Sequence, residues 1–145
     1  MKYLTFAIAS LAFSIEAPAQ STFPDLKGTW TGKGQSVVYG SNPHHPTEQT
    51  APVPRLREFE FTFVVTGQEG RSVWGYNYSN VAQTNEPFAW SLTNNGRSAI
   101  GADTDGYYQV TLEAADSMEL CYAHNRLSPS GSIVASCATY KRVNR

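Results

Sequence analysis

The sequence predicts an all-β fold, and three observations carry this prediction. Segments rich in Val, Thr, Tyr, Phe and Trp alternate with clusters of Gly, Asn, Asp and Pro, a rhythm typical of sandwiches and barrels. Apolar and polar side chains alternate with period two, as in residues 58–65, and no segment has convincing helical periodicity. Turn motifs such as Asn94-Asn95-Gly96 separate the segments, because Asn and Gly tolerate positive φ.

Eight segments qualify as strands. They span residues 28–39, 56–66, 71–79, 87–93, 97–102, 106–113, 117–124 and 131–142. Most are joined by short turns, which favours consecutive antiparallel hairpins. We therefore predict an eight-stranded up-and-down β-barrel, because closure removes exposed edge strands. A barrel of this size is either filled by side chains or holds one small ligand.

The N-terminus has the pattern of a secretory signal peptide. Lys2 precedes an apolar run over residues 3–15, and Ala17-Pro18-Ala19 fits the small-residue cleavage rule. The run is shorter than the roughly 20 apolar residues of a membrane span, which argues against an anchor. We expect cleavage before Gln20, a single mature domain over residues 20–145, and a secreted or periplasmic location.

The charge pattern limits the classes of partner that the chain can bind by electrostatic attraction. The formal net charge is −1, and no basic run is present. The chain therefore offers no electrostatic case for nucleic acid or anionic membrane. No second apolar stretch approaches the length of a membrane span.

Two cysteines, Cys121 and Cys137, predict one disulfide. An even number of cysteines in an exported chain is typical of cross-links. Both lie eight residues from Pro129, so a hairpin centred there places them opposite each other. A metal site is the alternative, but two thiolates with no nearby histidine pair make a poor one.

Gly28-Thr29-Trp30 resembles the Gly-x-Trp motif in the first strand of the calycins, the superfamily of lipocalins, fatty-acid-binding proteins and avidins. The resemblance implies a barrel that Trp30 closes at one end. It also implies a basic residue of the last strand, Lys141 or Arg142, packed over that ring as a cation against an aromatic face. The polar residues by which avidins hold biotin and the later lipocalin motifs have no counterpart here, so no ligand follows from the resemblance.

Aromatic residues in the strands are the candidate ligand contacts, because Tyr and Trp combine an apolar body with a polar group. Residues 40–55 form a long segment that predicts either a lid or a plain solvent loop. The alternative for the rings is that they simply fill the barrel. The candidate ligand-binding residues are Trp74, Tyr76, Tyr78 and Trp90 in strands, with His44 and His45 in the long segment.

No catalytic set can be assembled from the sequence. Glu58 and Glu60 share a face at a spacing that a glycosidase pair also has, but a solvent-facing strand explains them better. Asp103-Thr104-Asp105-Gly106 matches the start of a calcium loop, yet a hairpin turn is the simpler interpretation because the twelfth position is Ala114. No phosphate loop or nucleophile elbow is present. We expect no enzymatic activity, cofactor or metal site.

Two hypotheses for function follow. The first is a non-enzymatic exported barrel that binds a small apolar or aromatic molecule, with Trp74, Tyr76 and Trp90 lining the cavity. The second is a protein-interaction or enzyme-inhibitor module that acts through residues 40–55. The interior decides between them: a barrel packed solid with side chains, with no cavity above the size of a few water molecules, would exclude the first and leave residues 40–55 as the place to look.

Overall fold

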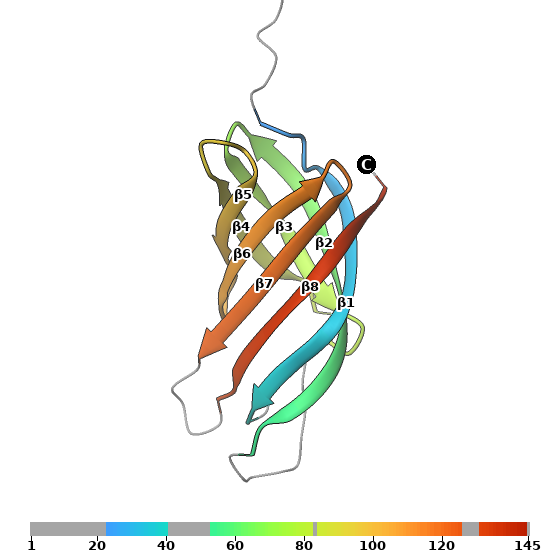
Figure 1. Ribbon diagram of the computed structural model, residues 1–145, viewed down its shortest axis with the longest axis vertical. Coiled ribbons are helices and arrows are strands. Elements are labelled where there is room, and N and C mark those ends of the chain that lie inside the picture. The colour runs from blue at the N-terminus through green and yellow to red at the C-terminus, as the bar shows by residue number, and fades with distance from the viewer. Residues whose placement is uncertain (1–22, 41–52, 83, 126–130, 145) are drawn as a thin grey trace, which may run out of the picture.

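The computed structural model of the chain describes residues 23–40, 53–82, 84–125 and 131–144. In these ranges the regular structure is β, and no helix has the length and apolar composition to cross a membrane. Eight antiparallel strands follow one another in chain order and close into a barrel (Figure 1), which confirms the predicted fold. The strands are β1 (Gly28–Tyr39), β2 (Arg55–Glu69), β3 (Ser72–Ser79), β4 (Glu86–Leu92), β5 (Ser98–Ala102), β6 (Tyr107–Ala114), β7 (Ser117–Asn125) and β8 (Ile133–Asn144).

Strand β2 departs most from its predicted bounds, because it continues to Glu69. The β2–β3 ladder shifts register between Val65 and Gly67. Such a bulge bends a strand without ending it. β2 therefore runs on to a turn in which Gly70 adopts a φ of 53°, a conformation that favours glycine.

Strand β1 closes the barrel by pairing on both sides. Trp30 lies opposite Phe63 of β2 and opposite Arg142 of β8. With β1 joined to both neighbours, no strand is left as an edge, so the backbone N–H and C=O groups of the ladders find partners within the sheet.

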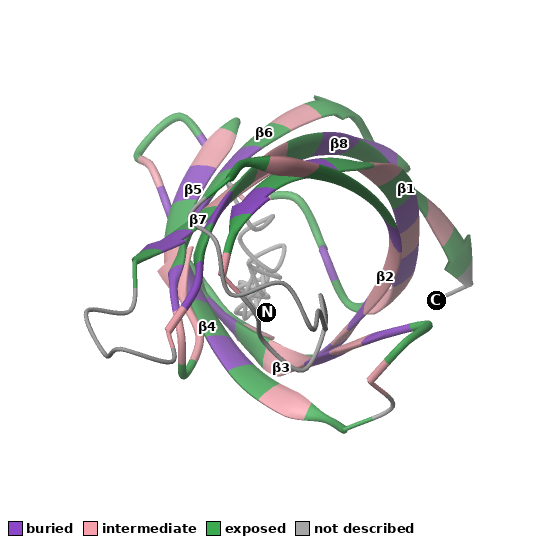
Figure 2. Ribbon diagram, turned by 90° about the horizontal axis from the view of Figure 1, so that it is seen from below, coloured by how far each residue is buried: buried purple, intermediate pink, exposed green. Residues whose placement is uncertain are grey.

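The two faces of the sheet alternate around the whole barrel. Figure 2, seen from below, shows the strands as a ring in which buried and exposed residues follow one another. In β2, Phe59, Phe63 and Val65 are buried, whereas Glu58 is exposed. The predicted alternation of apolar and polar side chains over residues 58–65 is confirmed.

In β3 the aromatic residues that we expected to face the interior lie on the outer face. Val73 and Asn77 are buried and face the interior, so Trp74, Tyr76 and Tyr78 lie on the outer face. Trp74 is 45% exposed. Three outward aromatic residues reverse the usual preference for large rings inside, which is why alternation alone misplaced them.

Stacked and edge-on aromatic rings fill the middle of the barrel. Phe63 is fully buried and contacts four rings at centroid separations of 5.3–5.5 Å, those of Phe88, Trp90, Tyr108 and Tyr140. Such contacts add to the hydrophobic stabilisation of the buried rings. The interior is therefore filled around Phe63, and any space for a ligand must lie toward one end.

The end at which β1 begins, uppermost in Figure 1, is closed by the segment that precedes it. Buried Leu26 donates its backbone N–H to the Gln68 side chain at 2.8 Å, and its carbonyl accepts from Trp30 Nε1 at 2.9 Å. Arg142 donates to the carbonyl oxygens of Asp25 and Lys27. Hydrogen bonds from three strands thus hold this covering segment, residues 25–27, over the end of the barrel.

The predicted disulfide is present. Cys121 of β7 lies opposite Cys137 of β8, with their Cα atoms 4.0 Å apart and the sulfur atoms bonded. Their neighbours Leu120 and Ala138 are buried in the core, so the bridge lies on the outer face. It cross-links the closing hairpin without occupying the interior.

Candidate binding cavity in the barrel

A cavity of about 40 Å³ lies toward the end at which β1 finishes, beyond the aromatic core. A space of that volume holds about three water molecules. Its apolar wall consists of Phe61, Phe63, Leu120, Val134 and Tyr140, with Tyr108 and Tyr122 beside them. Its polar wall consists of Ser36, Glu86, Asp103, Asp105, His124 and Ser136.

Tyr108 of β6 connects the core to the rim of the cavity. Its hydroxyl donates to Asp103 Oδ2 and accepts from Asn77 Nδ2 at 3.4 Å. Burial raises the pKa of Tyr108 above its usual value, and the charge and hydrogen bond of Asp103 raise it further, followed by smaller effects of Tyr122 and Glu86. Tyr108 therefore remains a neutral hydrogen-bonding group at physiological pH.

The turn between β5 and β6 fixes the Asp103 carboxylate. Asp103 Oδ1 accepts from the backbone N–H groups of Asp105 at 2.9 Å and Gly106 at 2.7 Å. This is the local bonding by which Asp shapes a turn, so the predicted hairpin turn is confirmed. The same hydrogen bonds hold a negative charge at the cavity in one orientation.

His124 of β7 anchors a second polar chain on the cavity wall. Its Nδ1 and the Tyr122 hydroxyl share a hydrogen bond at 2.9 Å, and its Nε2 and Ser132 Oγ share one at 2.8 Å. A serine beside a histidine also occurs in hydrolases. Here Ser132 is fully buried and does not line the cavity, so no substrate reaches its hydroxyl. The pair holds the wall together.

Three of the described lining residues are acidic, Glu86, Asp103 and Asp105, and none is Lys or Arg. Among the described residues, no three His, Cys, Asp or Glu side chains come together closely enough to hold a metal ion. The groups that line the described part of the cavity are therefore mainly carboxylates, hydroxyls and aromatic rings.

The aromatic residues proposed as ligand contacts do not line this cavity. Trp90 is buried in the core and stacks on Phe88 with ring centroids 4.5 Å apart. Trp74 covers the outer side of Gly67, where an added Cβ would lie 2.2 Å from the indole ring. Tyr76 and Tyr78 stack on each other on the outer face, with centroids 6.5 Å apart. None of these four strand residues is among those that line the cavity.

The remaining predicted residues fall elsewhere. His44 and His45 lie outside the described residues. At the closed end, the Arg142 guanidinium lies over the Trp30 ring, 4.4 Å from its centroid. Trp30 is fully buried, as expected for a residue that closes the barrel. Of the two basic residues considered, Arg142 makes this contact, while Lys141 donates to Ser117.

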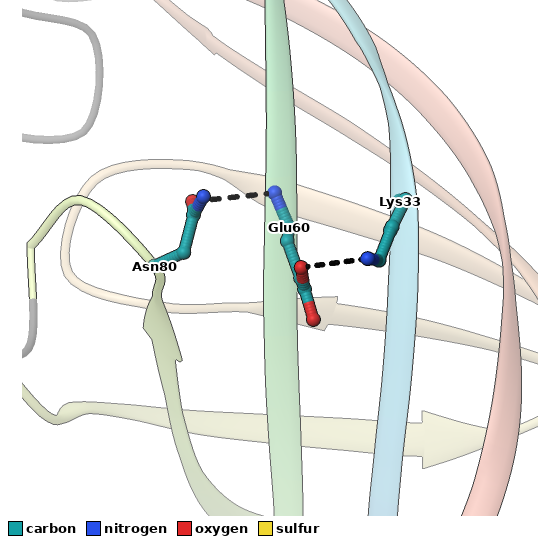
Figure 3. Close-up of polar contacts among 3 residues, drawn as sticks. All are labelled: Lys33, Glu60 and Asn80. Atoms are coloured by element: carbon teal, nitrogen blue, oxygen red, sulfur yellow. Dashed lines mark hydrogen bonds and ion pairs between the residues drawn. The ribbon is translucent and has the colours of Figure 1, made fainter.

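Glu58 and Glu60 belong to the outer surface. Glu60 pairs with Lys33 of β1 at 3.0 Å, and its backbone N–H donates to Asn80 Oδ1 at 3.4 Å (Figure 3). Glu58 is exposed. Because both carboxylates sit outside the barrel and one is paired with a lysine, the solvent-face interpretation describes them.

Sequence analysis missed Glu86 and did not connect Asp103 with Tyr108. Glu86 begins β4 after an irregular segment, so no alternation assigns its face. Tyr108 lies opposite Tyr122 across the β6–β7 ladder, and that register follows from neither residue alone. A usable signal did exist: Tyr122 and His124 alternate with buried Leu120, which places all three on the inner face.

Comparison with protein-family models, curated proteins and solved structures finds no match to this chain.

Proposed function

We propose that this chain is an exported, non-enzymatic binding protein of calycin-like architecture. Its ligand places one compact group in the cavity toward the end at which β1 finishes, and the rest of the molecule lies outside that cavity. The observation that carries the proposal is the asymmetry of the barrel. One end is sealed by Leu26, Trp30 and Arg142, whereas the other has a cavity with polar groups converging on it. Concave sites with few oriented polar groups are typical of ligand pockets.

The calycin-like assignment has two supports. The barrel closes in up-and-down order, and Gly28-Thr29-Trp30 begins its first strand. The Arg142–Trp30 contact is the one that the motif implies. Family resemblance names no ligand, so the ligand is argued from the cavity itself.

The cavity argues against the apolar or aromatic ligand expected from the sequence. About 40 Å³ is the volume of only a few water molecules, so the cavity is too small for the enclosed ligand of the first hypothesis, and its wall carries three carboxylic side chains. The proposal therefore concerns a compact polar group, with any larger part of the ligand lying outside the cavity.

A cavity-filling variant tests the proposal. Ser136 lines the cavity, and Ser136→Leu adds a side chain of about the missing volume. Ala135 is exposed on the opposite face, so Ala135→Leu is the matched control. A compound library is screened by thermal shift against the wild type. We expect hits that lose binding in Ser136→Leu and keep it in Ala135→Leu, with both variants folded.

Two results would contradict the proposal. One is a library without a single hit. The other is a set of hits that bind Ser136→Leu as well as the wild type, which would place them outside the cavity. Partner capture that survives Ser136→Leu but requires residues 40–55 would favour the interaction-module alternative instead.

A further inference from the structure

We propose that the outer face of strands β1, β2 and β3 binds a neutral carbohydrate chain. This site is separate from the cavity inside the barrel, so the inference goes beyond the proposed function and does not depend on it. Its basis is a line of three aromatic side chains along β3 that leads to an open depression lined by polar groups.

The depression on the outer face is much larger than the cavity in the interior. It has a volume of about 640 Å³, which is within the range of small-molecule binding sites, whereas the interior cavity has about 40 Å³. Five polar side chains line it, those of Lys33, Gln35, Glu58, Glu60 and Asn80. Because the depression is open to solvent, it can hold part of a chain that continues beyond it on either side.

Strand pairing arranges these polar groups in neighbouring rows. Lys33 lies opposite Glu60 across the β1–β2 ladder. Two residues along, Gln35 lies opposite Glu58. Asn80, directly after β3, flanks Glu60 on the other side, where its Oδ1 accepts from the Glu60 backbone N–H at 3.4 Å (Figure 3). The depression therefore extends across the outer side of three consecutive strands.

The polar groups of the depression suit a ligand rich in hydroxyl groups. Lys33 Nζ lies 3.0 Å from Glu60 Oε2, so these two charges balance each other. Glu58 and Gln35 are exposed, and neither side chain has a hydrogen-bond or ion-pair partner in the part of the chain that the structure describes. An amide offers both donors and an acceptor, and a carboxylate offers acceptors. A sugar hydroxyl both donates and accepts, so it can pair with either group.

Aromatic side chains continue the site along β3. Trp74, Tyr76 and Tyr78 occupy successive outward positions of the strand, and Asn80 follows two positions later. At the rise of a β-strand, the distance from Trp74 to Asn80 is roughly 20 Å. The rings of Tyr76 and Tyr78 stack with an interplanar angle of 25° and centroids 6.5 Å apart. The line of rings is therefore long enough for several sugar units.

The indole of Trp74 lies against the sheet and leaves part of its surface open. A Cβ added to Gly67 would overlap three atoms of the indole, so glycine is what allows the ring to approach the strand so closely. The side chain is nevertheless 45% exposed, so the side that faces away from Gly67 is accessible. An accessible aromatic face is an apolar surface on which the C–H groups of a sugar ring can pack.

The charge pattern favours a neutral carbohydrate over a charged one and over a protein. β3 contains no charged residue, so the line of rings offers nothing that an ionic ligand would need. Aromatic rings are also enriched at protein interfaces, but the centre of such an interface is depleted of charged groups. Here the rings lead directly to Glu58, Glu60 and Lys33, which a protein partner would have to bury at a cost. A hydrated sugar chain avoids that cost because its hydroxyls replace water.

The experiment measures the binding of soluble oligosaccharides to the purified protein by calorimetry. The neutral probes are cellohexaose, xylohexaose, mannohexaose, maltohexaose and chitohexaose, and the anionic probe is hexagalacturonate. We expect at least one neutral probe to bind and hexagalacturonate not to bind. The affinity for the neutral probe should change less than about twofold between low and high salt, because salt screens only interactions between charges.

Tryptophan fluorescence gives a direct measure of contact with the line of rings. The chain has three tryptophans, of which Trp30 and Trp90 are buried and Trp74 is exposed. A bound neutral hexasaccharide should shift the emission to shorter wavelength, because it removes water from the Trp74 indole. Trp74→Phe should abolish this shift. A shift that persists in Trp74→Phe would contradict the proposed contact.

Substitutions connect the affinity to the rings and to the depression. Tyr78→Ala and Gln35→Ala should each weaken binding of the neutral hexasaccharide about tenfold. Tyr78→Phe keeps the ring and should lose less than about threefold. Tyr107→Ala and Gln109→Ala are the matched controls, because these residues are exposed on the outer face of β6, and they should change nothing. Far-ultraviolet circular dichroism and melting curves show that each variant folds.

Four results would overturn the inference. The first is that none of the neutral probes binds, and the second is that hexagalacturonate binds most tightly. The third is sugar binding that Ser136→Leu abolishes, which would place the sugar in the interior cavity and leave the proposed function standing. The fourth is capture of a protein that requires Trp74 and Tyr78 while no oligosaccharide binds, which would make this face a protein interface.

Discussion

At the scale of single residues, Trp30 shows how one side chain connects three parts of the fold. It is fully buried, its Nε1 donates to the carbonyl of Leu26, and Arg142 covers its outer side. Arg142 in turn donates to Asp25 and Lys27 in the covering segment. Arg142 therefore links the covering segment to the last strand, in addition to the hydrogen bonds that Trp30 and Gln68 make with Leu26.

Replacing Arg142 tests this fastening. Arg142→Met keeps most of the side-chain volume but loses the cation–π contact and two hydrogen bonds. We expect the free energy of unfolding to fall by about 2 kcal/mol. Urea denaturation provides the measurement, and Arg57→Met, at an exposed position of β2, is the control. Equal midpoints for the two variants would show that Arg142 does not stabilise the closed end.

Two buried tyrosines predict a loss of stability at alkaline pH. Burial raises the pKa of both Tyr108 and Tyr140. Unfolded tyrosine ionises near pH 10, whereas these residues stay protonated in the folded state. The folded state then holds more protons, so the free energy of unfolding is unaffected below about pH 10 and falls above it.

The measurement is urea denaturation between about pH 8 and pH 11. Each pH unit above 10 should remove up to about 1.4 kcal/mol per buried tyrosine. In a spectroscopic titration of the mature protein, Tyr108 and Tyr140 should not ionise before the protein unfolds. Tyr108→Phe should show a shallower decline than the wild type. An identical decline would mean that Tyr108 ionises in the folded state.

At the scale of elements, β3 shows that alternation does not determine which face of a strand points into the barrel. The period of two correctly separated Trp74 from Val73, but either face is compatible with a strand of this composition. The structure turns Val73 inward, opposite Trp90 of β4. The indole of Trp74 then rests on Gly67 of β2, where a larger side chain would leave no room.

This placement reverses the expectation for Trp74. Because its ring lies outside the barrel, Trp74→Ala should leave any binding in the cavity unchanged. Stability should fall by only about 1 kcal/mol, since the ring is 45% exposed. Thermal denaturation and calorimetry with a cavity ligand check both statements. If a folded Trp74→Ala protein lost affinity for the ligand, the binding site would lie on the outer face of the barrel instead.

The disulfide belongs to the same scale, because it joins two strands of one hairpin. Cys121 and Cys137 are separated by 16 positions, and closing a loop of that length contributes about 3 kcal/mol in the chain-entropy model. The double replacement by serine should lower the melting temperature accordingly. Since the bridge lies outside the core, the double variant should fold and retain the cavity. A melting temperature equal to that of the wild type would contradict this.

At the scale of the whole molecule, closure of the barrel distributes stability unevenly. β1 and β8 each have 12 residues and β2 has 15, whereas β5 has only 5. Long ladders around β1 hold the seam between the first and last strands. The shortest strand provides the fewest ladder hydrogen bonds to its neighbours.

We therefore expect the barrel to open first around β5. Backbone amides of Ser98–Ala102 should exchange with deuterium faster than the paired amides of β1 and β8, because opening a short strand breaks fewer contacts. Hydrogen exchange followed by NMR makes the comparison residue by residue. Faster exchange in β1 and β8 would show instead that the seam is the weak point.

The sequence by itself determined the number of strands, their order and the closing disulfide, whereas the role of Trp30 was implied by the resemblance to the calycins. These features depend on local signals: periodicity, turn residues, and spacing about a single hairpin. It also placed Phe59 and Phe63 inward, because alternating glutamates left no other face for solvent. None of these predictions requires knowing which strands face each other across the interior of the barrel.

Only the tertiary structure decided where the cavity lies and what lines it. Asp103, Tyr122 and Glu86 come from separate strands and turns, and the tilt and register of the closed barrel bring them to one end. The same closure turned Trp74 outward and filled the centre with rings around Phe63. Such placements depend on packing across the barrel between residues distant in the chain, which strand periodicity does not encode.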